Sequence, residues 1–403
     1  HKKHIMKRTL VLLLLAMTAC KTNQSATDLA RWQAQAANVT IIRDDFGVPH
    51  IYGKTDAVAV FGLWYAQCED DFNRVEQNYI WAIGRLAEGE GEGELYSDLR
   101  AHLFMTEEEA KANYEKSPDW LKKLCDAFAD GVNFYLHSHP GVKPKLLTHF
   151  EPWYPMYFSE GSIGGDIEQI STEGIKAFYE DKEGLGNTDC QSVLSQLALT
   201  TNLGSAGSTD WQSVLRDDEP RGSNGFAISG KLTASGNAML LINPHTSFYF
   251  RPEVHVVSEE GLNAYGAVTW GQFFVYQGFN EKTGWMHTSS YADVMDDFVE
   301  TVTEENGKFF YKYGDEKRPI IAKQVTLKYK DGNEMKERKF PIYRTHHGPI
   351  THGIKVGEVQ NLPDLGQHWV ATAMMWDPVN ALIQSYTRTK QSGNKGFREM
   401  MNI

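Results

Sequence analysis

Apolar residues recur at helical spacing in the first part of this 403-residue chain, whereas beyond residue 223 they fall into short β-rich runs bounded by turns. The helical spacing predicts helices at residues 56–86 and 120–136, and the Gly/Glu-rich run at 88–94 should end the first of them. A short strand is predicted at residues 39–43. A chain of this length that is helical first and strand-rich second indicates two lobes or one large composite domain.

The second part of the chain predicts a series of strands separated by turn residues. Two of the turns, Glu-Asn-Gly and Lys-Asp-Gly, have the sequence of tight hairpins. The predicted strands cover residues 225–229, 238–242, 254–257, 265–269, 284–289, 298–303, 308–312, 324–330 and 339–343. Immediately before this series, residues 205–222 are rich in Gly, Ser, Asp and Pro, which is typical of a surface loop or a removable spacer.

The charge balance argues against some classes of partner. The formal net charge is −12, so nucleic acid and anionic lipid, which an acidic surface repels, are not expected as the main partners. Hydrophobic residues make up 41% of the chain, which is enough to build a sizeable core and argues against global disorder.

The first 20 residues predict an export signal that starts at Met6 and is preceded by upstream sequence. Lys7 and Arg8 stand before an apolar stretch at residues 10–15, and small residues lead from it to Cys20. The apolar stretch is far shorter than the ~20 residues that span a bilayer. Cys20 resembles the processing site of a bacterial lipoprotein, which predicts a periplasmic protein attached to the membrane only by a lipid on Cys20. Simple signal cleavage and a small core helix are the alternatives.

Three cysteines remain once Cys20 is set aside. Cys68, Cys125 and Cys190 have no spacing that suits a zinc site, and their odd number leaves at least one free thiol in an exported protein. One disulfide among them is compatible with export, and nothing in the sequence identifies the pair.

The segment around Ser223 contains a candidate nucleophile. A hydroxyl attacks poorly unless a base lies within hydrogen-bond reach. A serine that is itself an N-terminus carries such a base, because a free α-amine has a pKa of roughly 7.7–8. Gly222, which lacks Cβ, tolerates the strained backbone in which the Ser223 hydroxyl could attack its own upstream carbonyl. An ordinary turn before a strand is the alternative explanation of Gly-Ser-Asn.

Several motifs in one order resemble the penicillin acylase family of N-terminal-nucleophile hydrolases, which includes acyl-homoserine-lactone and cephalosporin acylases. The likeness extends from about residue 39 to the end of the chain. The motifs are Asp45-Phe-Gly-Val-Pro-His-Ile51, Phe61-Gly-Leu-Trp-Tyr-Ala-Gln67, Glu69-Asp70, Gly84-Arg-Leu-Ala-Glu88, Ser223-Asn224, Asn243-Pro-His245, Trp285-Met-His-Thr288 and Arg344-Thr-His-His-Gly-Pro349.

The resemblance implies roles for individual residues. Ser223 matches the nucleophile and, with Gly222, the autocleavage site. His245 matches a position that bonds near the nucleophile and lines the oxyanion region through backbone groups; a satisfied core histidine is the alternative. Ser289 aligns with a residue whose backbone N–H forms part of the oxyanion hole, where such donors supply a few kcal/mol of transition-state stabilisation.

The resemblance also implies one structural calcium ion. Asp293, Met295 and Asp296 correspond to the calcium-binding stretch of the penicillin acylases, Met295 through its carbonyl, and Glu173 corresponds to an upstream carboxylate of that site. Oxygen donors at this spacing suit a hard cation. Asp297 adds a further acid beside the set, and surface acids on a loop are the alternative.

For the fold, the resemblance implies an α+β protein: the αββα sandwich of N-terminal-nucleophile hydrolases with a mostly helical N-terminal segment. It divides the chain into a signal (1–20), a helical α-chain segment (21–204), a spacer (205–222) and the start of a β-chain (223–403). The two chains would arise from one precursor. The family's second oxyanion donor, an Asn, lies beyond the matched region, so this sequence is expected to be a fragment or a truncated protein.

These observations favour a self-cleaving amidohydrolase that removes an acyl group from an amide: an N-acyl-homoserine lactone, a β-lactam side chain or a related N-acyl amine. His245 tilts the expected substrate toward aliphatic acyl-homoserine lactones and away from penicillin G. A degenerate, non-catalytic acylase-like lipoprotein that binds acyl ligands is one alternative. A Ser-His-Asp hydrolase using Ser223 and His245 is another, although Gly-Ser-Asn differs from the usual nucleophile elbow. The candidate pocket walls, for which core packing is an equal explanation, are Phe226, Phe248, Trp270, Phe273 and Phe274.

Overall fold

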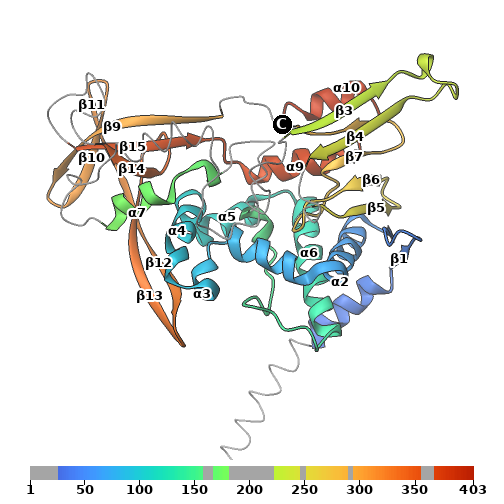
Figure 1. Ribbon diagram of the computed structural model, residues 1–403, viewed down its shortest axis with the longest axis horizontal. Helices are drawn as coiled ribbons and strands as arrows, with labels where there is room; N and C mark the ends of the chain where they lie inside the picture. The colour runs from blue at the N-terminus through green and yellow to red at the C-terminus, as the bar shows by residue number, and fades with distance from the viewer. Residues whose placement is uncertain (1–25, 158–166, 181–221, 246–250, 289–293, 355–366) are drawn as a thin grey trace, which may run out of the picture.

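The computed structural model describes residues 26–157, 167–180, 222–245, 251–288, 294–354 and 367–403 (Figure 1). Helices dominate the described residues up to 180, and strands dominate those from 222 to 374. Two clusters of buried apolar side chains form two cores, one around the longest helices and the other under a five-stranded sheet. This content defines an α+β protein.

The first core is built around two long helices, α2 (Asp56–Ala82) and α6 (Asp119–Ser138). They approach closely at Gly131, where a Cβ would lie 2.6 Å from the carbonyl oxygen of Phe61 and 2.9 Å from the Cβ of Trp64. Only glycine therefore fits at this crossing. The predicted helix at 120–136 is confirmed as α6, and its apolar face supplies buried side chains to the first core.

The predicted helix at 56–86 is confirmed as α2, which is shorter at its C-terminal end and has a kink. Thr55 caps it by accepting a hydrogen bond from the N–H of Val58 at 3.2 Å. Asp71 interrupts it with φ −159° and ψ 77°, and its side chain restarts the helix by accepting from the N–H of Arg74 at 3.0 Å. The helix ends at Ala82, because Gly84 follows with φ +65°.

The Gly/Glu-rich run at 88–94 was predicted to end the first helix, but α2 already ends at Ala82, before the run begins. The run lies in α3 (Leu86–Glu90) and the 3₁₀ turn η1 (Glu92–Glu94). The buried carboxylate of Asp98, on α4 (Leu95–Phe104), accepts from the first two N–H groups of α3 at 2.7 and 2.8 Å. This tertiary cap allows a short helix that its own sequence would not maintain.

Shorter helices complete the helical part. In α5 (Glu107–Lys116), Thr106 and Glu109 form a reciprocal capping box. The remaining elements are η2 (Tyr154–Tyr157), η3 (Ile167–Gln169) and α7 (Thr172–Glu180). A further helix at residues 26–36 is attached to α6 by Asp130. The Asp130 carboxylate accepts hydrogen bonds from the side chains of Arg31, Trp32 and Gln35.

A six-stranded sheet packs against the first core and joins the two parts of the sequence. Its strands, in spatial order, are β1 (Val39–Arg43), β2 (Pro49–Gly53), β5 (Glu253–Ser258), β6 (Asn263–Ala267), β7 (Gln277–Phe279) and β8 (Gly284–Trp285). Neighbours are antiparallel except β2 and β5, which pair in parallel with Ile51 opposite Val256. Residues before and after the proposed cleavage point therefore share one sheet.

A five-stranded sheet and a long hairpin surround the second core. The sheet contains, in order, β11 (Glu316–Pro319), β10 (Lys308–Tyr313), β9 (Met295–Glu305), β15 (Gln367–Met374) and β14 (Ile350–Ile354). The hairpin is β12 (Ile321–Asp331) with β13 (Glu334–Arg344), and it projects beyond α3 in Figure 1. Both predicted tight turns are confirmed, because Gly307 and Gly332 adopt φ +73° and +62° between paired strands.

A second hairpin, β3 (Gly222–Ile228) with β4 (Met239–His245), forms a separate two-stranded sheet whose tip projects outward at the upper right of Figure 1. Its tip contains the 3₁₀ turn η4 (Gly230–Leu232). One face carries exposed apolar side chains, with Phe226 61% exposed opposite Leu241 at 50%. The last helices are α9 (Pro378–Arg388) and α10 (Asn394–Met400).

All ten predicted strands overlap observed strands, and the one at 39–43 has the same bounds as β1. The boundaries differ by up to five residues where they lie within the described part, and Ser289, the end of the 284–289 prediction, lies outside it. The six-stranded and five-stranded sheets are separate sheets. The αββα sandwich stays a prediction, as do the boundaries at residues 20, 204 and 222.

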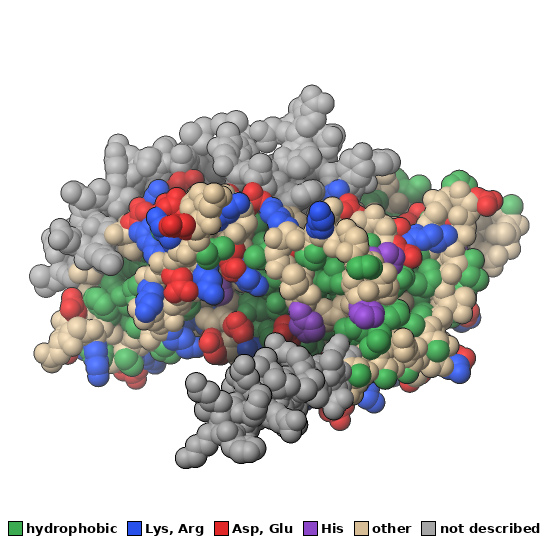
Figure 2. Space-filling model, turned by 90° about the horizontal axis from the view of Figure 1, so that it is seen from below, with side chains coloured by type: hydrophobic (Ala, Val, Ile, Leu, Met, Phe, Trp, Pro, Cys, Tyr) green, Lys and Arg blue, Asp and Glu red, His purple; other side chains and the backbone are tan. Residues whose placement is uncertain are grey.

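Cys68 and Cys125 are both buried and unbridged, and burial raises the pKa of each thiol. They are therefore unreactive packing residues, while Cys190 and Cys20 lie outside the described residues. No helix in the described ranges is long and apolar enough to cross a membrane. On the face seen in Figure 2, acidic and basic side chains are intermixed between apolar ones.

Candidate active site

Ser223 lies at the start of β3, where the hairpin register sets Gly222 opposite His245. Gly222 has φ +131°, a backbone conformation that favours glycine. The Ser223 hydroxyl donates to the carbonyl oxygen of Gly222 at 2.6 Å, so it is held against the peptide group directly upstream of it. The predicted pairing of a glycine with a nucleophilic serine thus has a specific local geometry.

His245 contacts Ser223 through its main chain. Its backbone N–H donates to the Ser223 hydroxyl oxygen, with an N···O distance of 3.3 Å. The imidazole lies among amides instead: His245 Nε2 is 3.2 Å from Asn224 Nδ2 and 3.1 Å from Asn243 Oδ1. The ring therefore does not act as the base for Ser223 in this arrangement, which argues against a Ser-His-Asp relay.

Thr288 is a site residue that sequence reasoning missed, although it ends one of the quoted motifs. Its hydroxyl accepts from the N–H of Ser223 at 3.0 Å and donates to the carbonyl of Ser223 at 2.9 Å. It thus orients the nitrogen that would become the free amine. The only sequence signal is a hydroxyl residue 65 positions downstream of Ser223, which no local pattern connects to it.

Next to Thr288, His287 is held in a cationic surrounding. The Arg388 guanidinium donates to His287 Nε2 at 3.0 Å, so the neutral ring carries its proton on Nδ1, which is buried with no hydrogen-bond partner among the described residues. Desolvation, with Arg388 and Arg251, lowers the pKa of His287 to about 3. The ring therefore stays neutral at physiological pH beside the serine site.

This lowered pKa predicts acid sensitivity. An unfolded chain binds a proton at His287 near pH 6.5 but the folded one only near pH 3, so stability should fall as pH decreases from 6.5 towards 3. The slope is at most about 1.4 kcal/mol per pH unit, less any solvent screening. Thermal denaturation of His287→Gln should show a weaker pH dependence than wild type, with exposed His149→Gln as control. Equal slopes in His287→Gln and wild type would contradict this.

Other predicted site residues have different outcomes. Ser289 and Asp293 lie outside the described residues, as does Phe248. Trp270, Phe273 and Phe274 are buried members of the first core, which agrees with the core-packing explanation of these aromatic residues. Phe226 is exposed on the β3–β4 hairpin.

The described calcium candidates come from two elements. Met295 and Asp296 begin β9, and Glu173 lies in the first turn of α7, where it accepts from the Ser171 hydroxyl at 3.1 Å. His352 on β14 lies between the two regions. Its Cβ is 3.5 Å from where a Cβ on Gly174 would be, and desolvation lowers its pKa although the nearby charge of Asp297 opposes the shift. The side chains of Glu173 and Asp296 are both exposed.

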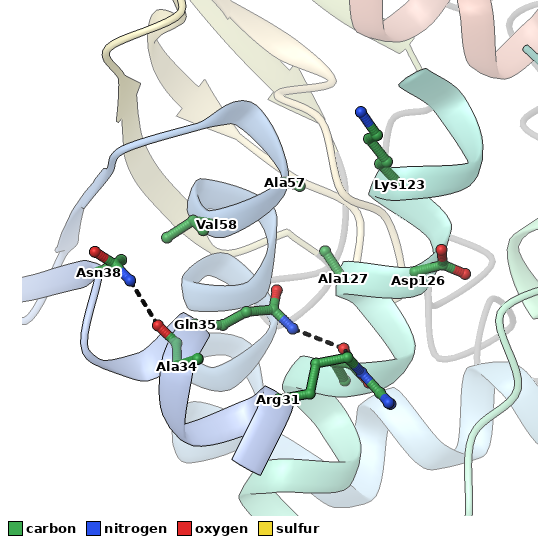
Figure 3. Close-up of a pocket in the computed structure, with 10 residues that line it drawn as sticks. Arg31, Ala34, Gln35, Asn38, Ala57, Val58, Lys123, Asp126 and Ala127 are labelled. Carbon is green, nitrogen blue, oxygen red and sulfur yellow. Dashed lines mark hydrogen bonds and ion pairs between the residues drawn. The ribbon is translucent and has the colours of Figure 1, made fainter. Parts of the chain in front are cut away.

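A pocket of about 400 Å³ lies elsewhere, between residues 26–38, α2 and α6 (Figure 3). Arg31, Gln35 and Asp130 join across it, and Asn38 bonds to the carbonyl of Ala34. None of the residues that line it belongs to the Ser223 site. Three of its polar side chains, Arg31, Gln35 and Asp130, are thus bonded to one another, and Asp126 accepts from the Tyr114 hydroxyl at 2.6 Å.

The match to known proteins extends over nearly the whole described chain. Residues 38–402 match the family model described as penicillin amidase, and this chain therefore belongs to the penicillin amidase family. The family expected from the motifs is confirmed.

Curated relatives carry two kinds of name. An acyl-homoserine lactone acylase QuiP of Pseudomonas fluorescens Pf-5 is 23% identical over 354 residues, covering 78% of this chain and 41% of that protein. An acyl-homoserine lactone acylase PvdQ of Pseudomonas savastanoi pv. phaseolicola is 25% identical, covering 78% and 42%. A penicillin acylase 2 proenzyme of Pseudomonas sp. SE83 is 23% identical, covering 79% and 44%. The chain spans less than half the length of these relatives.

Among solved structures, a thermostable penicillin G acylase from Alcaligenes faecalis in orthorhombic form matches 38% of this chain and 26% of its own. The TM-score is 0.30 and the sequence identity 19%. A score this low gives no basis for comparing the folds in detail.

Proposed function

We propose that this protein hydrolyses the amide bond of small N-acyl amines, with Ser223 as an N-terminal nucleophile freed by cleavage after Gly222. The observation that carries the proposal is the position of the Ser223 hydroxyl. It lies 2.6 Å from the carbonyl oxygen of Gly222 and 3.3 Å from the N–H of His245, so it touches the peptide group that must be cut and a main-chain donor at once.

Self-cleavage would begin with this hydroxyl. The Ser223 oxygen attacks the carbonyl carbon of Gly222, the C–N bond breaks, and the hydroxyl proton passes to the departing nitrogen of Ser223. An ester between Gly222 and the Ser223 oxygen results. Water then hydrolyses the ester, which leaves a carboxylate on Gly222 and a free amine and hydroxyl on Ser223. The name proenzyme, given to one relative, agrees with processing from one precursor into an α and a β chain.

After cleavage the same serine would act on substrate. Its α-amine, with an ordinary pKa of roughly 7.7–8, accepts the hydroxyl proton as the oxygen attacks the acyl carbonyl. Thr288, which contacts both the nitrogen and the carbonyl of Ser223, would orient that amine. The N–H of Ser289 is proposed as an oxyanion donor. An acyl-enzyme forms, the amine leaves, and water releases the acid.

For the substrate class we propose aliphatic N-acyl amides, acyl-homoserine lactones first among them. Two of the relatives named above are acyl-homoserine lactone acylases, and His245 stands at the position that favours this choice. The His245 ring bonds to the side chains of Asn224 and Asn243, and the exposed apolar side chains of Phe226 and Leu241 continue along that face of the hairpin.

Two further features belong to the proposal. One calcium ion would be held by Asp293, Asp296, Glu173 and the carbonyl of Met295, because the described carboxylates are exposed and oxygen donors suit this ion. The ion would fix the start of β9 to α7 and take no part in the chemistry. The protein would be periplasmic and lipid-anchored at Cys20.

The test uses the full-length gene product expressed with export. Intact-mass spectrometry should find two polypeptides, the second beginning at Ser223, and the preparation should release free amine from an N-acyl-homoserine lactone. A single uncleaved chain that still hydrolyses the amide would overturn the nucleophile assignment. A cleaved protein without activity on N-acyl amides would overturn the substrate class and favour a non-catalytic ligand-binding protein.

A further inference from the structure

Outside the Ser223 site, three side chains with metal-binding chemistry lie close together beside the five-stranded sheet. Glu300 comes from β9 and is only 3% exposed, whereas His346 and His347 come from the turn between β13 and β14. One ligand atom from each residue lies within 4.8 Å of the others. Among the described residues, these three form the group of His, Cys, Asp and Glu side chains whose ligand atoms lie close enough to share one metal ion.

The turn that carries the two histidines is tightly fixed. Thr345 donates its N–H to the carbonyl of Gly348 at 2.9 Å, and the N–H of His347 donates to the Thr345 hydroxyl at 3.2 Å. Gly348 has φ +157°, and a Cβ there would lie 2.1 Å from the carbonyl oxygen of Thr372 on β15. The turn is thus pressed onto the sheet, which holds both imidazoles in place.

Neighbouring groups orient each ring. His346 Nδ1 is 2.7 Å from the Tyr311 hydroxyl, which leaves its Nε2 available. His347 Nδ1 is 2.8 Å from the Glu300 carboxylate, and the ring stacks on Phe298 with a centroid distance of 3.8 Å and an angle of 3°. Ligating histidines are commonly fixed by a bond through the second ring nitrogen or by packing of this kind.

We propose that Glu300, His346 and His347 bind one transition-metal cation, Zn²⁺ being the best match. Two imidazoles and one carboxylate form a donor set that zinc accepts with a fourth position open to water. The ion would replace the proton shared by His347 and Glu300, or use the remaining nitrogen of His347. Exposed His346 provides the path of entry. This site differs in chemistry from the calcium site, whose proposed donors are all oxygens.

The charges around the cluster permit a cation. The Arg318 guanidinium is placed over the Tyr313 ring and bonded to Glu316 at 2.8 Å, so its charge is partly compensated. The competing explanation is a purely structural His347–Glu300 pair with His346 as its neighbour.

Calorimetric titration of the full-length protein decides between these explanations. Protein freed of metal by chelation and returned to buffer with excess Ca²⁺, which would fill the proposed calcium site, is titrated with ZnCl₂. We expect one Zn²⁺ per chain, and visible absorption of a tetrahedral ion when CoCl₂ replaces ZnCl₂. His346→Ala alters an exposed side chain and should fold, yet it should lose this binding.

His149→Ala is the matched control, because His149 is exposed, lies beside Glu151 and stands outside the cluster. It should retain one Zn²⁺ per chain. His347→Gln, checked for native near-ultraviolet circular dichroism, should lose binding as His346→Ala does. The proposal is overturned if wild type binds no Zn²⁺ in excess Ca²⁺, or if His346→Ala keeps the wild-type stoichiometry. Neither result depends on amide hydrolysis.

Discussion

Replacing Ser223 by alanine should leave the precursor as one uncut polypeptide and reduce amide hydrolysis by roughly 10⁴-fold or more, the usual cost of removing a nucleophile. The reason is that both reactions use the same oxygen, which lies 2.6 Å from the Gly222 carbonyl oxygen. Gel electrophoresis and intact-mass spectrometry would measure the cut, and release of amine from an N-acyl-homoserine lactone would measure the activity.

Ser229→Ala is the matched control, since Ser229 follows β3 on the same hairpin and bonds only within the hairpin tip, to the N–H of Lys231. It should be cleaved and active like wild type. Thr288→Val, which keeps the shape of the side chain but removes its two bonds to Ser223, should slow both reactions by about 10- to 100-fold. Normal processing of Ser223→Ala would refute the proposed mechanism.

Replacing Glu76 by alanine should be the most damaging change to stability among those considered, costing on the order of 3–5 kcal/mol. Glu76 lies on α2, is buried, and accepts hydrogen bonds from the backbone N–H groups of Lys145, Leu146 and Leu147 at 2.8, 2.6 and 2.8 Å. Without the carboxylate these donors lose their acceptor and the segment after α6 loses its anchor. Urea denaturation would measure the decrease in the free energy of unfolding.

Glu76→Gln retains one acceptor oxygen and should cost less than Glu76→Ala. Glu115→Ala is the matched control, because the Glu115 side chain is 74% exposed and makes only a long ion pair with Lys122, at 3.8 Å. It should change stability by no more than about 0.5 kcal/mol. A loss of under about 1 kcal/mol in Glu76→Ala would mean that water or relaxation replaces the carboxylate, contrary to this account.

Elements fixed by local chemistry could be predicted from the sequence. The hairpins at Gly307 and Gly332 follow from turn residues that tolerate positive φ, and α6 follows from an uninterrupted apolar face. The capping box of Thr106 and Glu109 was an equally local signal for α5, and it went unused.

Elements fixed by distant contacts could not be predicted in this way. The break of α2 at Asp71 reads as one more acid on a helical face, and α3 exists because Asp98 caps it from another helix. The parallel pairing of β2 with β5 joins residues about 200 positions apart, for which periodicity has no signal.

The candidate site divides along the same line. The Gly222–Ser223 geometry and the main-chain contact of His245 agree with what the motif order implied. The roles of Thr288 and of the neutral His287 depend on contacts with Ser223 and Arg388, which are distant in the sequence. Local sequence patterns therefore could not predict these roles.

The parallel contact of β2 with β5 has a consequence for any cut between them. Cleavage of the backbone after Gly222 would give two polypeptides, but the six-stranded sheet and the first core would stay intact because both polypeptides contribute to them. Neither polypeptide alone would contain all the strands of this sheet, because β2 lies before the cut and its partner β5 lies after it. Assembly must therefore come before scission, and the two products, once unfolded apart, would face a bimolecular search that the precursor never meets.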